Sequence, residues 1–468
     1  MTTGSLPLSV APLIPLLALV GTALSILLAE LWQAPWRFSA WLALAGMAVT
    51  AALFLIVVLS GQSGVIQGML AIDGTAVLFT LLFCAAGAVV VLLELGSVRT
   101  ERGARYTLVL FAISGAAIVA QSTHLLTLAL GLTTAAVASS ALLGSAVAWR
   151  HHVQQIVSLA CVLFGAVLLY GAAGSLRLDM LVDRLGPPAT EGQANPLAAL
   201  GLGLTLGGLS LPLGILPWTV WAPGPLGRMN TRDGCVGSLL LAQVSVAALA
   251  RLAGTWSSTA GALIATLGAA SVLYGYTNAL CRHRVHDALV GVVMAQSGAI
   301  LLHIALVPVE GSTRLFYALG NAGLNLACLW AAAVNARTSG SDPLQLDDLA
   351  GLGRRRPWLA GALTLCLLNL ASAPPLSGAV SRVWLLRAGW AAGQKWAAAM
   401  AIAGSLTAWL FAGRWTLTMW MSPRKERAWA PTTPEIVVVG VTAAAGMLLA
   451  GIYAGPVWRW IAAVIAGP

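Results

Sequence analysis

The sequence predicts an all-α polytopic membrane protein with about fourteen transmembrane helices, and three observations support this. Of its 468 residues, 59% are hydrophobic and only 9% are charged, whereas a soluble protein carries roughly 25% charged residues. The apolar runs are about as long as the roughly 20 residues that one bilayer crossing requires. They are also too long and too uniformly apolar for barrel strands, and because backbone groups in lipid must be paired internally, helices remain.

The apolar runs define the predicted helices in order, and they leave no room for a large soluble domain. No Lys or Arg precedes Arg37, so the first run lacks a signal peptide's basic segment and we expect it to be a retained helix. Only 175–196 and 336–356 look extramembrane and sizeable. The predicted helices are 9–30, 39–59, 74–97, 105–121, 125–148, 153–174, 197–221, 234–253, 260–281, 286–306, 312–335, 357–387, 395–420 and 434–455.

The net charge of +10 predicts an orientation rather than a nucleic-acid partner. The basic residues stand in ones, twos and threes between apolar runs, as is typical of cytoplasmic loops. Loops after odd-numbered helices hold most of them, including Arg37, Arg150 and Arg354 to Arg356. The positive-inside rule therefore places these loops in the cytoplasm, and with an even helix count both termini are expected outside.

The sequence predicts no metal site, no cofactor and no catalytic centre of its own. The six cysteines are scattered without ligand spacing, which favours small buried core residues. An enzyme acting on lipid would need a carboxylate pair or a nucleophile with a base, and the pair Asp347–Asp348 is better interpreted as a solvated turn.

Two apolar runs are interrupted by proline, which breaks a helix by removing a backbone donor and clashing with the preceding turn. Pro212 and Pro217 interrupt predicted helix 7, and Pro374 and Pro375 interrupt predicted helix 12. Broken helices at corresponding places in two halves of a chain favour a transporter of inverted repeats with its ion path at the breaks. The alternative for each break is a packing kink resolved by neighbouring helices.

Several segments, in order, resemble the N-type antiporter-like subunit of respiratory complex I. The stretch DDLAGLGRRRPWLAGALTLCLLNLASAPPLSG resembles the loop and broken helix of that subunit, whose pattern runs from DLAGL to PPLxGF. Further similar segments are ARYTLVLFAISGAAIVAQSTHLLTLALGL, VLFGAVLLYGAAGS, LPWTVWAP, ALARLAG and HRVHDALVGVVMAQSG. The resemblance spans about residues 70 to 420.

The resemblance implies fourteen helices with two inverted five-helix repeats, broken at helices 7 and 12. It predicts N-terminal helices over 1–104, repeats over 105–255 and 256–422, and a C-terminal helix and tail over 423–468. It also implies other membrane subunits of a complex I-like assembly as partners, beside the lipid bilayer, in a bacterial inner (plasma) membrane.

The family relays protons along buried Lys, Glu and His residues at the bilayer midplane, and most of these charges are replaced here. The helix 5 glutamate falls on Thr133, and the helix 7 lysine falls on Pro212. The helix 8 lysine falls near Ala242 or Gln243, and the helix 12 lysine is Arg382. A hydroxyl or a proline stores no proton, and arginine stays charged.

A rerouted path would need a group that titrates near neutrality, for which histidine is the natural candidate. Only His303 falls inside an apolar run, where a hydrogen-bonded packing role near the outer interface is the alternative. His124 is expected at a helix start, His151 and His152 in a loop, and Arg251 near a helix end, snorkelling to the interface. Gln296 is a further polar candidate that could instead simply bond between helices.

Two functions therefore remain open. The first is a membrane-arm subunit of a quinone- or hydrogenase-linked assembly with proton pumping impaired or absent. The second is an active proton- or cation-translocating subunit that uses a rerouted path.

Overall fold

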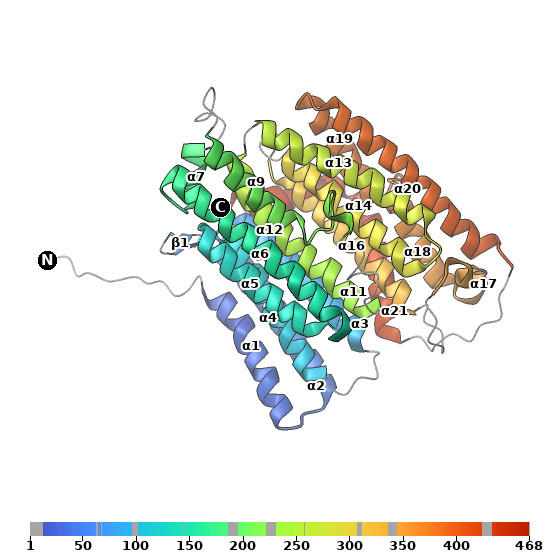
Figure 1. Cartoon of the computed structure of the whole chain (residues 1–468). Coiled ribbons are helices and arrows are strands. Elements are labelled where there is room, and N and C mark those ends of the chain that lie inside the picture. The colour runs from blue at the N-terminus through green and yellow to red at the C-terminus, as the bar shows by residue number, and fades with distance from the viewer. Residues whose placement is uncertain are drawn as a thin grey trace.

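The chain folds into a bundle of long helices (Figure 1). The computed structural model describes residues 13–61, 64–66, 68–95, 102–143, 145–185, 195–220, 231–256, 258–306, 311–335, 344–423 and 433–467. Within these ranges, twelve helices are long and apolar enough to cross a membrane. The two proline-broken segments add two crossings, so the prediction of about fourteen is confirmed.

The helices follow the predicted order. The first half contains α1 (Ile14–Leu31), α2 (Trp36–Leu59), α3 (Gly74–Leu95), α4 (Arg102–Gln121), α5 (Leu125–Leu142), α6 (Ser145–Ala173), α7 (Leu178–Leu185), α9 (Pro196–Ser210), η2 (Trp218–Val220), α11 (Thr231–Val236), η3 (Gly237–Leu241), α12 (Ala242–Leu252) and η4 (Ala253–Thr255). The second half contains α13 (Ser258–Cys281), α14 (Val285–Ala305), α16 (Thr313–Asn335), η5 (Leu346–Leu349), α17 (Leu352–Arg355), α18 (Pro357–Leu370), α19 (Ser377–Ala391), α20 (Lys395–Met421), α21 (Pro434–Ile452) and α22 (Ala454–Ala466).

A small antiparallel hairpin precedes α3. Its strands β1 (Gly64–Ile66) and β2 (Leu70–Ile72) pair with Val65 opposite Ala71. The backbone N–H of Thr123 donates to the carbonyl of Met69 at 3.0 Å, which ties the hairpin to the α4–α5 connection. This hairpin and the helices α7 and α22 were not expected from the sequence.

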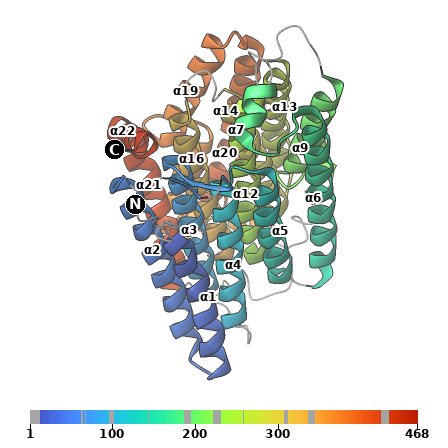
Figure 2. The ribbon, with the colours of Figure 1, turned by 90° about the vertical axis from the view of Figure 1, so that its left-hand side faces the viewer.

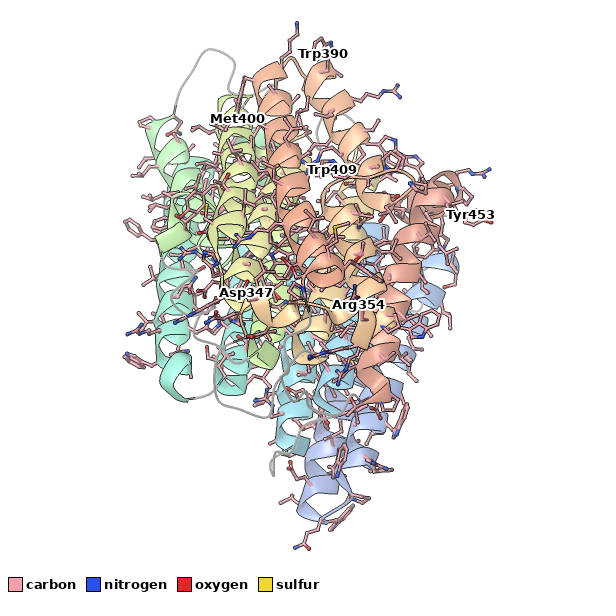
Figure 3. All side chains as sticks on the ribbon, turned by 90° about the vertical axis from the view of Figure 1, so that its right-hand side faces the viewer. Asp347, Arg354, Trp390, Met400, Trp409 and Tyr453 are labelled. Carbon is pink, nitrogen blue, oxygen red and sulfur yellow. The ribbon has the colours of Figure 1, made fainter. Side chains whose placement is uncertain are left out.

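Burial separates central helices from peripheral ones. The membrane-crossing part of α14 is 94% buried, whereas that of α1 is 28% buried. Figure 2 shows α1 and α2 side by side at one edge of the bundle, with α16 and α12 further inside. In Figure 3, Trp390 lies at one end of the molecule, and Asp347 and Arg354 lie well away from it toward the other end.

The two repeats are recognisable from one helix contact that occurs twice. In the first repeat, α4 and α5 meet where a Cβ on Gly115 would lie 2.5 Å from the Ala135 nitrogen. In the second, α13 and α14 meet where a Cβ on Gly275 would lie 2.5 Å from the Ala295 nitrogen. Each residue of the second contact lies 160 positions after its counterpart in the first. In both helix pairs the missing Cβ of glycine lets the two backbones approach closely.

The connections into α5 and α14 repeat in the same way. The N–H of Leu125 donates to the carbonyl of Leu176 at 3.0 Å, and the N–H of Val285 donates to the carbonyl of Leu344 at 2.9 Å. Five crossings separate the two connections, so they lie at opposite ends of the bundle. The fold is therefore two inverted five-helix repeats with broken helices 7 and 12, as predicted.

The predicted boundaries on both sides of the connection between helices 5 and 6 were wrong, because α5 ends at Leu142 and not near 148. Helix α6 begins at Ser145, not near 153, so His151 and His152 lie inside a helix instead of a loop. Both side chains find polar neighbours there, since His151 Nε2 lies 3.3 Å from Gln155 Nε2 and His152 Nδ1 lies 3.3 Å from Ser140 Oγ. Polar contacts with this helix and with α5 thus replace the water that a loop would have required.

Candidate functional site

The break in helix 12 lies between the end of α18 at Leu370 and the start of α19 at Ser377. It contains the cis peptide bond between Pro374 and Pro375. Asn369 closes the break, because its Oδ1 accepts the Gly378 backbone N–H at 2.6 Å. This bond satisfies one of the donors that the start of a helix leaves without a partner.

Helix α16 braces this break through two asparagines spaced one helical turn apart. Asn369 Nδ2 donates to Asn321 Oδ1 at 2.8 Å and to Asn325 Oδ1 at 3.1 Å. Ser377 Oγ also donates to Asn321 Oδ1, at 2.7 Å. The result is a network of amides and hydroxyls that connects α16, α18 and α19 at the break.

The break in helix 7 is braced in the same manner. Helix α9 ends at Ser210, and Pro212 and the cis Leu216–Pro217 bond follow it. From α6, Gln154 Nε2 donates to the carbonyl of Leu211 at 3.0 Å, and Ser158 Oγ donates to that of Gly208 at 2.6 Å. In both repeats, two polar residues four positions apart on the preceding helix therefore support the break.

A small polar cavity of about 20 Å³ lies beside the helix 12 break. A cavity of this size has room for about one water-sized occupant. It lies between α13, α14, α16, α18 and α19. Its polar lining consists of Tyr276, Gln296, His303, Asn321, Asn369, Ser372, Ser381 and Arg382.

His303 and Arg382 both reach this cavity, so the structure brings together three of the predicted candidates, these two and Gln296. His303 is buried at the last turn of α14, with Nε2 3.3 Å from Ser381 Oγ on α19. Its Nδ1 has no hydrogen-bond partner among the described residues, and neither has Nη1 of Arg382.

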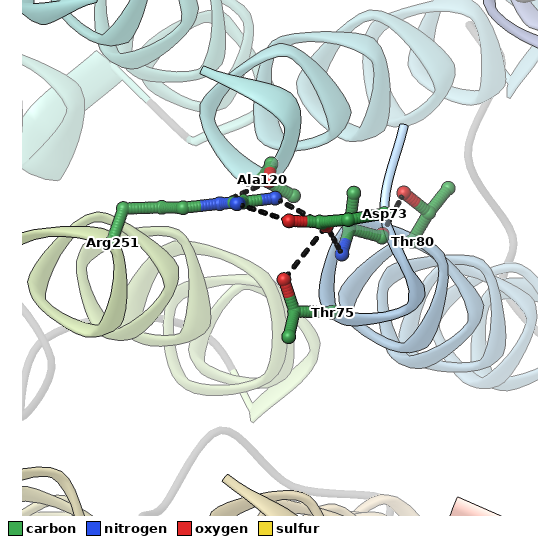
Figure 4. Close-up of polar contacts among 6 residues, drawn as sticks. Asp73, Thr75, Thr80, Ala120 and Arg251 are labelled. Carbon is green, nitrogen blue, oxygen red and sulfur yellow. Dashed lines mark hydrogen bonds and ion pairs between the residues drawn. The ribbon is translucent and has the colours of Figure 1, made fainter. Parts of the chain in front are cut away.

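Arg251 and His124 lie elsewhere, and the interpretation of Arg251 as snorkelling to the interface was wrong. Arg251 forms a two-pronged ion pair with Asp73, from Nη1 to Oδ2 at 2.7 Å and from Nη2 to Oδ1 at 2.8 Å, and its Nε donates to the carbonyl of Ala120 at 2.6 Å (Figure 4). Burial opposes ionisation of Asp73, but the Arg251 guanidinium and the hydrogen bonds from Ala76 and Thr75 together outweigh it and hold the pKa of that carboxyl below its usual value. These contacts join the end of α12, the end of α4 and the start of α3.

Asp73 also serves as the helix cap expected from the sequence. Its Oδ1 accepts the Ala76 backbone N–H at 2.7 Å. His124 likewise caps α5, with Nδ1 accepting the Leu126 N–H at 3.2 Å. Burial and the neighbouring Arg177 lower the pKa of His124, which favours the neutral ring that this bond requires.

A second ion pair is buried near the opposite end of α3. Arg105 Nη2 donates to Glu94 Oε1 at 2.6 Å, and Arg105 Nη1 donates to the carbonyl of Leu142 at 2.6 Å. The pair ties α4 to α3 and to the last turn of α5. The pair lies at helix ends, where it connects three helices, and it does not line the cavity at the helix 12 break.

Comparison with known proteins decides the family. The family model described as NADH:quinone oxidoreductase/Mrp antiporter, transmembrane, matches residues 122–407 of this chain. The chain belongs to this antiporter family. It is therefore a polytopic membrane protein of the antiporter-like subunit type.

Two relatives match this chain along most of their length. NADH-quinone oxidoreductase subunit N 1 of Herpetosiphon aurantiacus is 27% identical over 92% of this chain and 91% of its own. The F(420)H(2) dehydrogenase subunit N of Methanosarcina mazei is 28% identical over 95% of this chain and 96% of its own.

Solved structures agree in fold. A chain of respiratory complex I from Thermus thermophilus, with bound aureothin, is 26% identical, covers 97% of this chain and 100% of its own, and superimposes with a TM-score of 0.83. A chain of the Mrp complex from Dietzia sp. is 16% identical over 97% of this chain and 96% of its own, with a TM-score of 0.84, and so shows the fold alone.

The positions onto which the resemblance places the relay of the family are Thr133, Pro212, Ala242 or Gln243, and Arg382. Thr133 donates its hydroxyl to the carbonyl of Ala129 in its own helix at 2.7 Å. Pro212 lies inside the helix 7 break, and Gln243 is buried on α12. The whole sequence contains only two lysines, Lys395 at the start of α20 and Lys425 outside the described residues.

Four polar residues of the cavity, Tyr276, Asn369, Ser372 and Ser381, were not among the candidates from the sequence. A polar residue inside an otherwise apolar run six positions before Pro375 was an available signal for Asn369. Nothing in the sequence placed Tyr276 or Ser381 beside it, because they come from α13 and α19.

Proposed function

We propose that this antiporter-like chain is a membrane-arm subunit of a complex I-like assembly, with its proton pumping impaired or absent. One observation carries the proposal: apart from His303, the polar lining of the cavity at the helix 12 break consists of amides, hydroxyls and the cation Arg382. The names of the relatives, subunits N of quinone oxidoreductases and of an F(420)H(2) dehydrogenase, support other membrane subunits as its partners.

The physical argument concerns proton storage. Lysine and glutamate can gain and lose a proton when a neighbouring charge changes, which couples one site to the next. An amide does not titrate near neutrality, and a guanidinium, with a pKa above about 12, remains charged. A row of such groups can orient water but cannot hold and release protons in sequence.

The second candidate function is proton or cation translocation by a rerouted path through His303. The observation that favours it is the position of His303, buried in the cavity wall with Nδ1 unpaired and Nε2 beside Ser381. Histidine is the side chain whose charge changes most readily near neutral pH.

The number of protons moved per electron, measured on the whole assembly, distinguishes the two candidate functions. The intact assembly is purified in mild detergent, and the subunits that co-elute with this chain are identified. The assembly is then reconstituted into liposomes and supplied with the electron donor that those subunits use. We expect His303→Gln and Arg382→Gln to leave the number of protons moved per electron unchanged, because neither group is part of a relay. A lower ratio in either variant, with the subunits still assembled and electron transfer intact, would establish the rerouted path instead.

We also propose the repeat boundaries 105–255 and 256–422, on the 160-residue spacing of the glycine contacts, and an orientation with the arginine-rich loops in the cytoplasm and both termini outside. The structure offers a natural probe of the orientation in Cys281, an exposed free thiol at the end of α13.

A membrane-impermeant maleimide is expected to label Cys281 in inverted vesicles and to leave it unlabelled in intact cells. The matched control is Ser60→Cys in a Cys281→Ser background, because Ser60 is exposed at the end of α2 on the other side. That thiol is expected to react in intact cells. The opposite pattern for the two thiols would reverse the proposed orientation.

A further inference from the structure

The cavity at the helix 12 break carries a cation without an anion. Nη1 of Arg382 is buried there and has no hydrogen-bond partner among the described residues. No carboxylate belongs to the residues that line the cavity. A buried charge is stable only when it is paired or well hydrogen-bonded, so the chemistry of the site calls for a negative partner.

His303, which lines the same cavity, supplies a second donor. The residue is only 2% exposed, and its Nδ1 is unpaired among the described residues. The Ser381 hydroxyl can donate to Nε2 across their 3.3 Å contact. In that arrangement the neutral ring carries its hydrogen on Nδ1, which is then a donor.

The start of helix α19 adds to this positive field. Gly378, Ser381 and Arg382, all from its first two turns, line the cavity. The N-terminus of a helix carries roughly half a positive charge from its aligned peptide dipoles and favours anions. Helix α19 spans 15 residues, which is long enough for this effect.

We propose that this cavity binds one small monovalent anion of the chloride type, held by Arg382 Nη1 and His303 Nδ1. Its volume of about 20 Å³ suits a single small ion and is too small for phosphate or sulfate. The bound anion neutralises the guanidinium beside the helix 12 break and holds α14 and α19 together. The inference goes beyond the proposed function and holds whether or not protons cross the subunit.

The first test measures thermal stability of the purified assembly while sodium chloride replaces sodium gluconate at constant ionic strength. We expect a saturable rise in the melting temperature of this subunit of about 2 °C. Arg382→Gln is expected to abolish the rise. The matched control is Arg387→Gln, an exposed arginine five residues later on the same helix, and it is expected to keep the full rise.

The second test does not depend on a variant that folds. The unmodified assembly is crystallised in bromide, and its anomalous scattering is mapped. A bromide peak within hydrogen-bond distance of Arg382 Nη1 supports the site. Three outcomes would overturn the proposed anion site. They are a melting temperature that does not change with chloride, an equal response of Arg382→Gln and Arg387→Gln, and a map without a bromide peak at the cavity.

Discussion

Gly275→Ala is expected to lower the free energy of unfolding by about 3 kcal/mol, near the top of the range for overpacking. The new Cβ would lie 2.5 Å from the Ala295 nitrogen and 2.6 Å from the Gly291 carbonyl oxygen. Both are backbone atoms of a neighbouring helix and cannot rotate away, so α13 and α14 must separate along their length. Thermal denaturation of the detergent-purified chain, followed by gel filtration, measures the loss.

The control for this prediction is Gly413→Ala on α20, where no atom lies within 4 Å of the added Cβ. Alanine favours a helix over glycine by up to about 1 kcal/mol, so this variant is expected to be neutral or more stable. Gly115→Ala tests the same contact in the first repeat and is expected to resemble Gly275→Ala. Equal stability of Gly275→Ala and Gly413→Ala would show that the two helices can separate freely.

Arg105→Met is expected to lower stability by about 3–5 kcal/mol, because it leaves the buried Glu94 carboxylate without its ion partner. The two side chains are 13% and 7% exposed, and Nη2 of Arg105 lies 2.6 Å from Glu94 Oε1. The double variant Glu94→Leu, Arg105→Met removes both charges and is expected to recover most of the loss. Thermal stability and yield of the folded chain measure all three proteins.

An exposed pair provides the comparison. Arg177 and Asp179 are 49% and 57% exposed, and Nη2 of Arg177 lies 2.5 Å from Asp179 Oδ2. Because water screens such a pair, Arg177→Met is expected to leave the stability nearly unchanged. If the double variant at Glu94 and Arg105 were no more stable than Arg105→Met alone, the unpaired carboxylate would not be the cause.

The positions of the helices and of their breaks follow largely from the sequence, because a lipid environment permits few backbone structures. Apolar runs without water must be helices, and paired prolines must end the backbone bonding of a helix wherever they stand. Pro212, Pro217, Pro374 and Pro375 therefore marked both breaks correctly, and the spacing between the breaks indicated the repeats. The assignment of relay positions to Thr133 and Pro212 came from the resemblance and stays a prediction.

The errors concern polar residues whose partners, near or far along the chain, the sequence did not indicate. His151 and His152 looked like loop residues because a polar run normally marks water, yet Ser140 of α5 lies beside His152, and Gln155 lies one turn from His151. Arg251 looked like a snorkelling residue because its partner Asp73 lies 178 positions away. A single sequence shows that a polar group exists but not which group meets it.

Composition and proline placement alone were enough for the helical membrane fold and its number of crossings. The polar cavity, its unpaired donors on Arg382 and His303, and the bracing of each break by the preceding helix depend on contacts between helices. The reason is range, since burial in lipid and helix breaking act on a residue locally, whereas a hydrogen bond requires two groups that only packing brings within about 3 Å.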